Sequence, residues 1–146
     1  FCGQRPSDTL RMSETDIKNG YLNIKQNKTS QKLRVRIVGA IAEVIERIKE
    51  RKRELAKNGK KVIALFLVCD EGGRKLGRAG LRTRFDRART ESGQTFQFRD
   101  IRAKAGTDLD DLAHAQKLLG HRNRSTTEKY VRKRRGESVE PLARKL

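Results

Sequence analysis

The spacing of apolar residues changes partway along this chain, and that change limits the possible folds more than any other feature. Residues 21–25 and 33–37 alternate apolar with polar side chains, as strands with one wet face do, and polar residues 26–32 separate them. The next segment has apolar residues at helical spacing, at Ile41, Val44, Ile45, Ile48 and Leu55. The two patterns predict a β-hairpin followed by a long helix, and therefore a chain that mixes both kinds of structure.

The remainder of the chain is predicted to form short elements joined by loops. These are a short helix over residues 6–12, a buried strand over 62–68, a basic helix carrying Leu81, Phe85 and Ala88, and three short helices from Phe98 to Arg132. Asp108 and Ser125 are predicted as helix caps, and Gly106 and Gly120 as breaks. We expect a mainly helical α+β domain over residues 1–132 and a carboxy-terminal arm over residues 133–146.

The chain carries a large excess of positive charge. Among its 146 residues, 36 Lys and Arg stand against 18 Asp and Glu, which gives a formal net charge of +18. A surface field of this sign attracts phosphates, and Lys and Arg supply most of the affinity of nucleic-acid binders. Ribosomal and chromatin proteins share this composition. Charge therefore predicts a polyanionic partner without choosing a function.

Several classes of protein and site are disfavoured by the sequence. It has no apolar run near the roughly 20 residues that cross a bilayer, and no charged-then-apolar leader, so a cytoplasmic protein is expected. Cys2 and Cys69 belong to no zinc-binding spacing, and Gly72 to Gly80 lacks the ending of a nucleotide-binding Walker loop. No metal or cofactor is expected. Because the first residue is Phe1, we expect a fragment of a longer protein.

Three short motifs near the carboxy end carry the chemistry. They are Phe98-Arg99-Asp100-Ile101-Arg102, Leu118-Leu119-Gly120-His121 and Ser125-Thr126-Thr127-Glu128-Lys129-Tyr130. Together they resemble the signature of the tyrosine recombinases, the phage-integrase family, including the nine-residue step from His121 to Tyr130. Upstream, Gly3-Gln4-Arg5-Pro6-Ser7-Asp8 resembles the first arginine motif of the family, and Gln26-Asn27-Lys28-Thr29 resembles its lysine-bearing turn. The resemblance covers essentially the whole chain and implies a small antiparallel sheet at one side of the helices.

The resemblance also implies a role for each motif residue. Tyr130 would be the nucleophile, because a phenolate attacks phosphorus and its phosphodiester keeps the bond energy for rejoining. Arg5 and Arg102 would bind the non-bridging phosphate oxygens, since a guanidinium donates two parallel hydrogen bonds. His121 would hydrogen bond the phosphate, and Lys28 would protonate the leaving 5′ oxygen. Without the motif, a packing role for Tyr130 and a solvated position for the arginines would be favoured instead. Lys25 and Lys32 remain alternatives to Lys28.

Two further positions qualify this resemblance. Arg99 stands where the family pattern most often has histidine, and an arginine cannot act as a base at neutral pH, so it could only bind phosphate or lower the phenol pKa. The phenol proton would then pass to water, to His121 or to the phosphate. Asp8 resembles a supporting carboxylate that holds an arginine, although stabilisation of a helix dipole explains it equally well.

The activity implied is site-specific DNA recombination without a metal ion. Tyr130 would form a 3′-phosphotyrosyl link on double-stranded DNA, and four protomers would exchange strands through a Holliday junction, as in integration of a phage or mobile-element genome. Two alternatives remain at this point. One is a type IB-like topoisomerase that relaxes DNA as a monomer. The other is a catalytically impaired DNA-binding relic, in which Arg99 marks lost chemistry.

Overall fold

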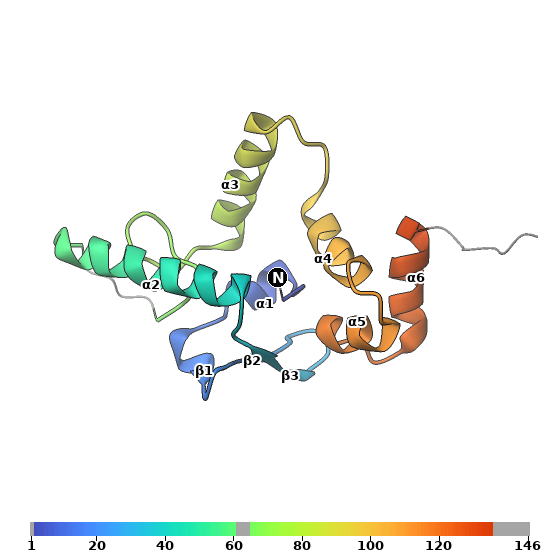
Figure 1. Cartoon of the computed structure of the whole chain (residues 1–146). Coiled ribbons are helices and arrows are strands. Elements are labelled where there is room, and N and C mark those ends of the chain that lie inside the picture. Colours follow the sequence, from blue (N-terminus) through green and yellow to red (C-terminus); the bar gives the residue numbers. More distant parts are fainter. Residues whose placement is uncertain (1, 61–64, 136–146) are drawn as a thin grey trace, which may run out of the picture.

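The computed structural model describes residues 2–60 and 65–135, and these residues form a mainly helical α+β domain (Figure 1). The elements in chain order are α1 (Pro6–Thr9), the 3₁₀ turn η1 (Glu14–Asp16), β1 (Ile17–Lys18), β2 (Tyr21–Lys25), β3 (Lys32–Arg36), α2 (Ala40–Lys57), α3 (Arg78–Glu91), α4 (Phe98–Thr107), α5 (Leu112–Leu119) and α6 (Arg124–Arg135). The predicted fold class is confirmed. So are the hairpin, the helix that follows it and the three carboxy-terminal helices.

The three strands form one antiparallel sheet in the order β1-β2-β3. In the register of β2 and β3, Leu22 lies opposite Val35 and Ile24 lies opposite Leu33. Because side chains alternate along a strand, these four apolar residues share one face. The hairpin prediction missed β1, whose signal is the Asn19-Gly20 pair. Both residues have positive φ, 51° and 74°, as a tight two-residue hairpin turn requires.

Helix α2 covers the apolar face of the sheet. The buried cluster consists of Met12, Leu22, Ile24 and Leu67, and α2 adds the half-buried Ile41 and Ile48. Burial of such side chains contributes about 25 cal/mol per Å² of apolar surface removed from water, so this contact stabilises the hairpin, which alone would be marginal. Figure 1 shows α2 on one side of the molecule and α4 to α6 on the other, with the sheet below them.

The strand predicted over residues 62–68 is not confirmed. Residues 61–64 lie outside the described part of the chain. Within residues 65–68 the backbone makes one bridge, between Phe66 and Ser13, and Leu65 is 59% exposed. Of residues 65–68, Leu67 alone is buried in the core, and its N–H donates to the Met12 carbonyl at 2.8 Å. An apolar run does not specify pairing, and here only one residue of the described run reaches the cluster.

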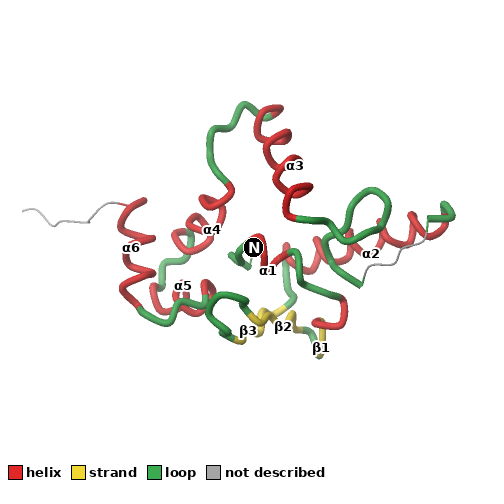
Figure 2. Tube along the Cα trace, turned by 180° about the vertical axis from the view of Figure 1, so that it is seen from behind, coloured by secondary structure: helices red, strands yellow, loops and turns green. Residues whose placement is uncertain are grey.

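Helices α4, α5 and α6 pack against one another beside the end of the hairpin (Figures 1 and 2). The predicted caps were wrong. Asp111 caps α5 by accepting from the N–H groups of Ala113 and His114, whereas Asp108 ends α4 and Ser125 lies inside α6. Any of the three acidic residues Asp108, Asp110 and Asp111 has the capping oxygen, and the chain geometry selects the last of them.

The two glycines of this region have different roles. Gly106 lies inside α4, so the predicted break there is wrong; a Cβ at this position would come within 2.7 Å of Leu119 Cδ1. Gly120 does end α5, with φ +61°, as predicted. The first glycine therefore permits close helix packing, and the second permits the left-handed turn that leads to His121.

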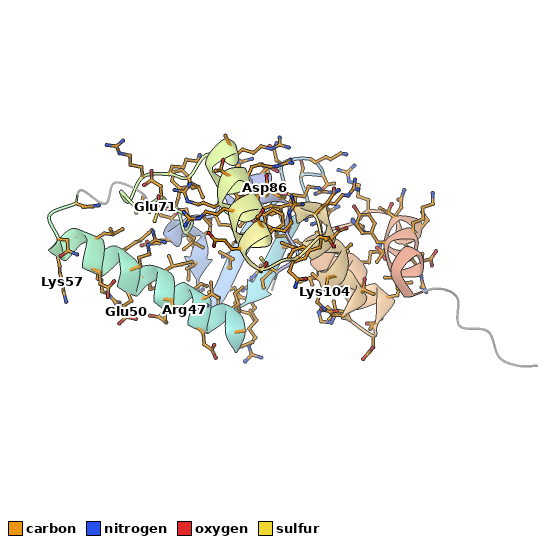
Figure 3. All side chains as sticks on the ribbon, turned by 90° about the horizontal axis from the view of Figure 1, so that it is seen from above. Arg47, Glu50, Lys57, Glu71, Asp86 and Lys104 are labelled. Atoms are coloured by element: carbon orange, nitrogen blue, oxygen red, sulfur yellow. The ribbon has the colours of Figure 1, made fainter. Side chains whose placement is uncertain are left out.

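Most of helix α3 projects away from the other helices (Figures 1 and 2), although the ring centroid of its Phe85 lies 4.6 Å from that of Phe98 at the start of α4. It has no buried residue, and the charged side chains of α2 labelled in Figure 3, Arg47, Glu50 and Lys57, likewise point into solvent. Figure 3 also labels Glu71, which forms an ion pair with Arg84 of α3. Within residues 2–60 and 65–135, no helix has the length and apolar character needed to cross a membrane.

Candidate active site

Arg102 is the buried centre of the candidate site. It lies on the second turn of α4, is only 7% exposed, and donates hydrogen bonds to the backbone carbonyls of Gly3 and Leu119. Burial, followed by repulsion from Arg5, lowers the pKa of Arg102 to about 10. The guanidinium therefore stays charged at neutral pH. Since it has five N–H groups, the two carbonyls fix its position without using its full donor capacity.

Arg5 approaches the same place from the amino-terminal segment. It lies at the N-cap position of α1, and its Nη1 is 3.4 Å from Gln26 Oε1 and 3.9 Å from Asp8 Oδ2. The Asp8 side chain is buried, and its other oxygen accepts the Asn27 N–H at 2.9 Å. The predicted supporting role of this carboxylate thus has a geometric basis, since Asp8 contacts both an arginine and the turn after β2.

His121 lies between Arg102 and helix α6. Its Nε2 is 3.4 Å from Arg102 Nη2, and its Nδ1 is 3.0 Å from Thr127 Oγ1. Burial, and then the charges of Arg102 and Arg5, lower the pKa of His121 to about 4, so the ring is neutral at neutral pH. Because a guanidinium only donates, Nε2 is the acceptor, and the ring proton belongs on Nδ1, facing Thr127.

Tyr130 completes the cluster from α6. Its ring centroid is 5.4 Å from that of His121, and the residue is 38% exposed. Thr127 lies one turn earlier on the same helix and is fully buried. Residues three positions apart are neighbours on one face of a helix. The buried Thr127 therefore anchors the turn of α6 next to Tyr130, and Tyr130 itself stays open to solvent.

The structure brings together four of the six residues predicted for the site, namely Arg5, Arg102, His121 and Tyr130. Lys28 and Arg99 are exposed, and no described contact joins either of them to those four. Lys28 lies in the turn between β2 and β3, next to Asn27, which Asp8 holds. Arg99 lies on the first turn of α4, one turn before Arg102.

Sequence reasoning gave no role to Gln26, which the structure places among these residues. Gln26 is fully buried and contacts both Arg5 and Thr29. A signal was present, because Gln26 continues the inward-facing series of Leu22 and Ile24 at a spacing of two. A polar residue at such a position needs buried hydrogen-bond partners.

No metal site competes with this cluster in the part of the chain that the structure describes. There, no three His, Cys, Asp or Glu side chains gather closely enough to hold a metal ion.

The comparison with protein families decides the family. The model of the phage integrase family matches residues 1–137, nearly the whole chain. The chain belongs to the phage integrase family. The resemblance found in its motifs is thereby confirmed. A comparison with curated protein sequences gives no match.

Solved structures similar to this family member share its fold. A lambda integrase tetramer bound to a Holliday junction gives a TM-score of 0.76 at 23% identity, over 95% of this chain and 42% of that one. The lambda integrase catalytic core gives 0.64 at 25% identity, over 84% of this chain and 75% of that one. XerH recombinase in a post-cleavage complex gives 0.66 at 21% identity, over 92% and 40%. This chain spans less than half of the tetrameric lambda integrase and XerH chains that it matches.

Proposed function

We propose that this chain is the catalytic part of a site-specific DNA recombinase that cuts and rejoins DNA through a 3′-phosphotyrosyl link to Tyr130. The observation that carries the proposal is the meeting of Arg5, Arg102, His121 and Tyr130 at one place, from segments far apart in the sequence. Family membership supports the same reaction class. Metal-free phosphoryl transfer needs a nucleophile, stabilisation of charge and a proton donor; the phenol and the two cations would supply the first two, and Lys28 would supply the third.

The two arginines would bind the scissile phosphate. Like charges repel, and repulsion from Arg5 adds to burial in lowering the pKa of Arg102, so the pair is held together at an electrostatic cost. A phosphate between them would relieve that cost by pairing with both guanidinium groups. The carbonyls of Gly3 and Leu119 hold Arg102 before any DNA arrives, which is the preorganisation that electrostatic catalysis requires.

The chemical step would proceed from Tyr130. Its phenolate oxygen forms a bond to phosphorus as the bond from phosphorus to the 5′ oxygen breaks, and Lys28 gives a proton to that oxygen. His121 is neutral, so its Nε2 could accept the phenol proton, whereas a hydrogen bond to the phosphate would require the ring proton to be on Nε2 instead of Nδ1. Arg99 cannot accept a proton, and its part would be to attract phosphate or stabilise the phenolate.

The partner would be double-stranded DNA. The net charge of +18 supplies non-specific affinity for its backbone. Lambda integrase occurs as dimers and as a tetramer on DNA, and we extend this to the present family member as a tetramer that exchanges strands through a Holliday junction. An enzyme of this class would act in integration or excision of a phage or mobile element.

Covalent capture tests this function directly. The 146-residue chain is incubated with a pool of nicked duplexes whose central base pairs are randomised, and adducts that survive denaturation are recovered and sequenced. The wild type is expected to yield adducts enriched in a defined sequence, and Tyr130→Phe is expected to yield none. Tyr21→Phe is the matched control, because Tyr21 is the other tyrosine of the chain and lies on β2, away from the site.

The other possible results of the covalent capture experiment lead to different conclusions. No adduct from the wild type contradicts the proposal and leaves a DNA-binding relic. Adducts without sequence enrichment, together with relaxation of any supercoiled plasmid, would indicate a topoisomerase instead. Adducts that persist in Tyr130→Phe would show that another residue is the nucleophile.

A further inference from the structure

The amide of Gln26 joins the separate segments that carry the candidate site. Its Nε2 donates to Gln4 Oε1 at 2.7 Å and to the Leu119 carbonyl at 3.0 Å. Its Oε1 accepts from Thr29 Oγ1 at 2.6 Å and from Arg5 Nη1 at 3.4 Å. The carbonyl can only accept and the guanidinium can only donate, so the orientation of the amide is determined. All four hydrogen-bonding positions of this buried side chain are used.

The nitrogen end of the amide is tied to the end of α5. The Leu119 carbonyl accepts from both Gln26 and Arg102, and the next residue, Gly120, leads directly to His121. A Cβ on Gly120 would lie 2.5 Å from Gln26 Nε2, so the amide fits against bare backbone. Figure 1 shows the connection between β2 and β3 reaching α5 at this point.

The oxygen end of the amide is tied to the turn that carries Lys28. Thr29 directly follows Lys28, and its hydroxyl shares the Gln26 oxygen with Arg5. The same turn is held from two other sides. Asp8 accepts the Asn27 N–H at 2.9 Å, and Arg122 Nη2 donates to the Thr29 carbonyl at 2.9 Å. Lys28 is therefore an exposed side chain on a backbone turn that is fastened on both flanks.

We infer that Gln26 is a positioning residue that, through one carbonyl oxygen, sets the turn carrying Lys28 relative to the Arg5 guanidinium. The inference rests on the proposed function, in which Lys28 is the general acid and Arg5 binds the phosphate. A lysine with a long, flexible side chain protonates the leaving oxygen most efficiently when its backbone is fixed. Misplacement of a catalytic group by about 1 Å can lower the reaction rate about 100-fold. The contacts to Gln4 and Leu119 hold the amide so that it can hold the turn.

Leaving-group chemistry separates this role from simple support of the fold. The duplex recovered by covalent capture is prepared in two forms, one with the normal 5′ bridging oxygen and one with sulfur at that position. A thiol has a pKa near 8.5, far below that of an alcohol, so the sulfur leaves without being protonated. A substitution that acts through the acid should slow cleavage of the oxygen form and affect the sulfur form much less.

The variants are Gln26→Met, Gln4→Met and Thr29→Val. Gln26→Met is expected to cleave the oxygen form about 10- to 100-fold more slowly, with a smaller loss on sulfur that reflects Arg5. Thr29→Val removes only the hydroxyl of a half-exposed residue, so it should fold normally and show the same selective loss in weaker form. Thr29→Ser, which keeps the hydroxyl, should cleave faster than Thr29→Val. Gln4→Met removes the other buried amide, which holds one end of the Gln26 amide but contacts neither Arg5 nor Thr29, so its loss on the oxygen form should be much less selective than that of Gln26→Met.

The outcomes separate the inference from the proposed function. If wild-type chain forms no adduct on either substrate, the proposed function fails and the inference fails with it. If wild type cleaves both but the losses in Gln26→Met and Thr29→Val are equal on oxygen and sulfur, the function stands and the positioning role is overturned. A loss in Gln4→Met that is as large and as selective for the oxygen form as that in Gln26→Met would also overturn it.

Discussion

The candidate site and helix α3 use the same residue type, arginine, in opposite ways. Arg102 is buried, and its hydrogen bonds go to backbone carbonyls of two distant segments. The α3 arginines Arg82 and Arg87 are 77% and 79% exposed at the side chain, and each pairs with a carboxylate four residues along the same helix. The buried arginine therefore connects parts of the fold, whereas the exposed ones connect only neighbouring turns.

This difference predicts where substitutions will be costly. A buried polar group that loses its partner bears its desolvation penalty in full, whereas an exposed ion pair between successive helix turns contributes about 0.3 to 0.5 kcal/mol. We therefore expect conservative changes in the site to destabilise the domain and similar changes on α3 to be nearly silent.

The largest effect is expected for Arg102→Lys. A lysine keeps the charge but has no planar fork, so it cannot reach the Gly3 and Leu119 carbonyls together. We expect a loss of about 3 to 4 kcal/mol in the free energy of unfolding, measured by urea denaturation. Arg82→Lys on α3 is the matched control and should change the free energy by less than about 0.5 kcal/mol. Equal losses in the two variants would remove the contrast between the regions.

Gly120→Ala should have the next largest effect. The residue has φ +61°, and an added Cβ would meet the Gln26 amide at 2.5 Å. The left-handed backbone costs about 1 to 2 kcal/mol for a non-glycine residue, and displacement of a buried amide adds to it, so we expect about 2 to 3 kcal/mol in total.

Gly93→Ala supplies the control for that prediction. Gly93, after α3, also has positive φ, +66°, but a Cβ there would meet nothing within 4 Å. Thermal or urea unfolding should therefore show only the backbone cost, about 1 kcal/mol. If Gly120→Ala and Gly93→Ala lose the same unfolding free energy, the contact between the added Cβ and Gln26 costs nothing. The close packing of Gly120 against Gln26 would then be contradicted.

The pH dependence of stability gives a smaller effect at the site. Burial and two arginines lower the pKa of His121 from 6.5 to about 4, so the unfolded chain binds the proton more readily than the folded one. Above pH 6.5 the ring is neutral in both states, and its contribution to the free energy of unfolding is fully present. That contribution is lost as the pH falls from 6.5 toward 4, because protons then favour the unfolded chain. Because the ring is only half-buried, we expect about 1 kcal/mol after solvent screening.

His121→Gln tests that prediction. Glutamine does not titrate, so the free energy of unfolding of the variant should fall less steeply than that of the wild type across this pH range. His114→Gln is the control, because His114 lies on the exposed side of α5. Parallel curves for wild type and His121→Gln would show that His121 has an ordinary pKa.

Much of the fold was predictable because its signals are local. The alternating strands, the spacing of α2 and the left-handed turn at Gly120 each follow from a few neighbouring residues. The strand expected over 62–68 is not confirmed in its described residues, 65–68, because an apolar run says nothing about its pairing partners. The capping residue of α5 was misassigned because several acidic residues are adjacent there, and only the path of the chain chooses Asp111.

Motif residues of the site could be predicted from the sequence, but the buried Gln26 network that holds them could not. Motif spacing pointed to Arg5, Arg102, His121 and Tyr130, and the structure brings these four together, while their catalytic roles stay proposals. The Gln26 network joins residues up to 93 positions apart, and such pairings depend on how the elements pack. A local pattern could have revealed only that Gln26 faces inward.

The smallest expected change in stability, on α3, is also the one that most sharpens the comparison. Arg87 is 79% exposed at the side chain and pairs with Glu91 on the same helix, so Arg87→Gln should cost less than about 0.5 kcal/mol of unfolding free energy. If α3 contacts the DNA backbone in the proposed function, the same variant should weaken binding to any duplex and reduce the slope of log affinity against log salt by about 1. Glu91→Gln breaks the same ion pair but removes a negative charge, so it should match Arg87→Gln in stability and leave the salt slope at the wild-type value.

An unchanged slope in Arg87→Gln would show that this arginine lies away from DNA. A reduced slope would show that α3 contributes its charges to binding and not to the fold, whereas buried Arg102 would serve both under the proposed function.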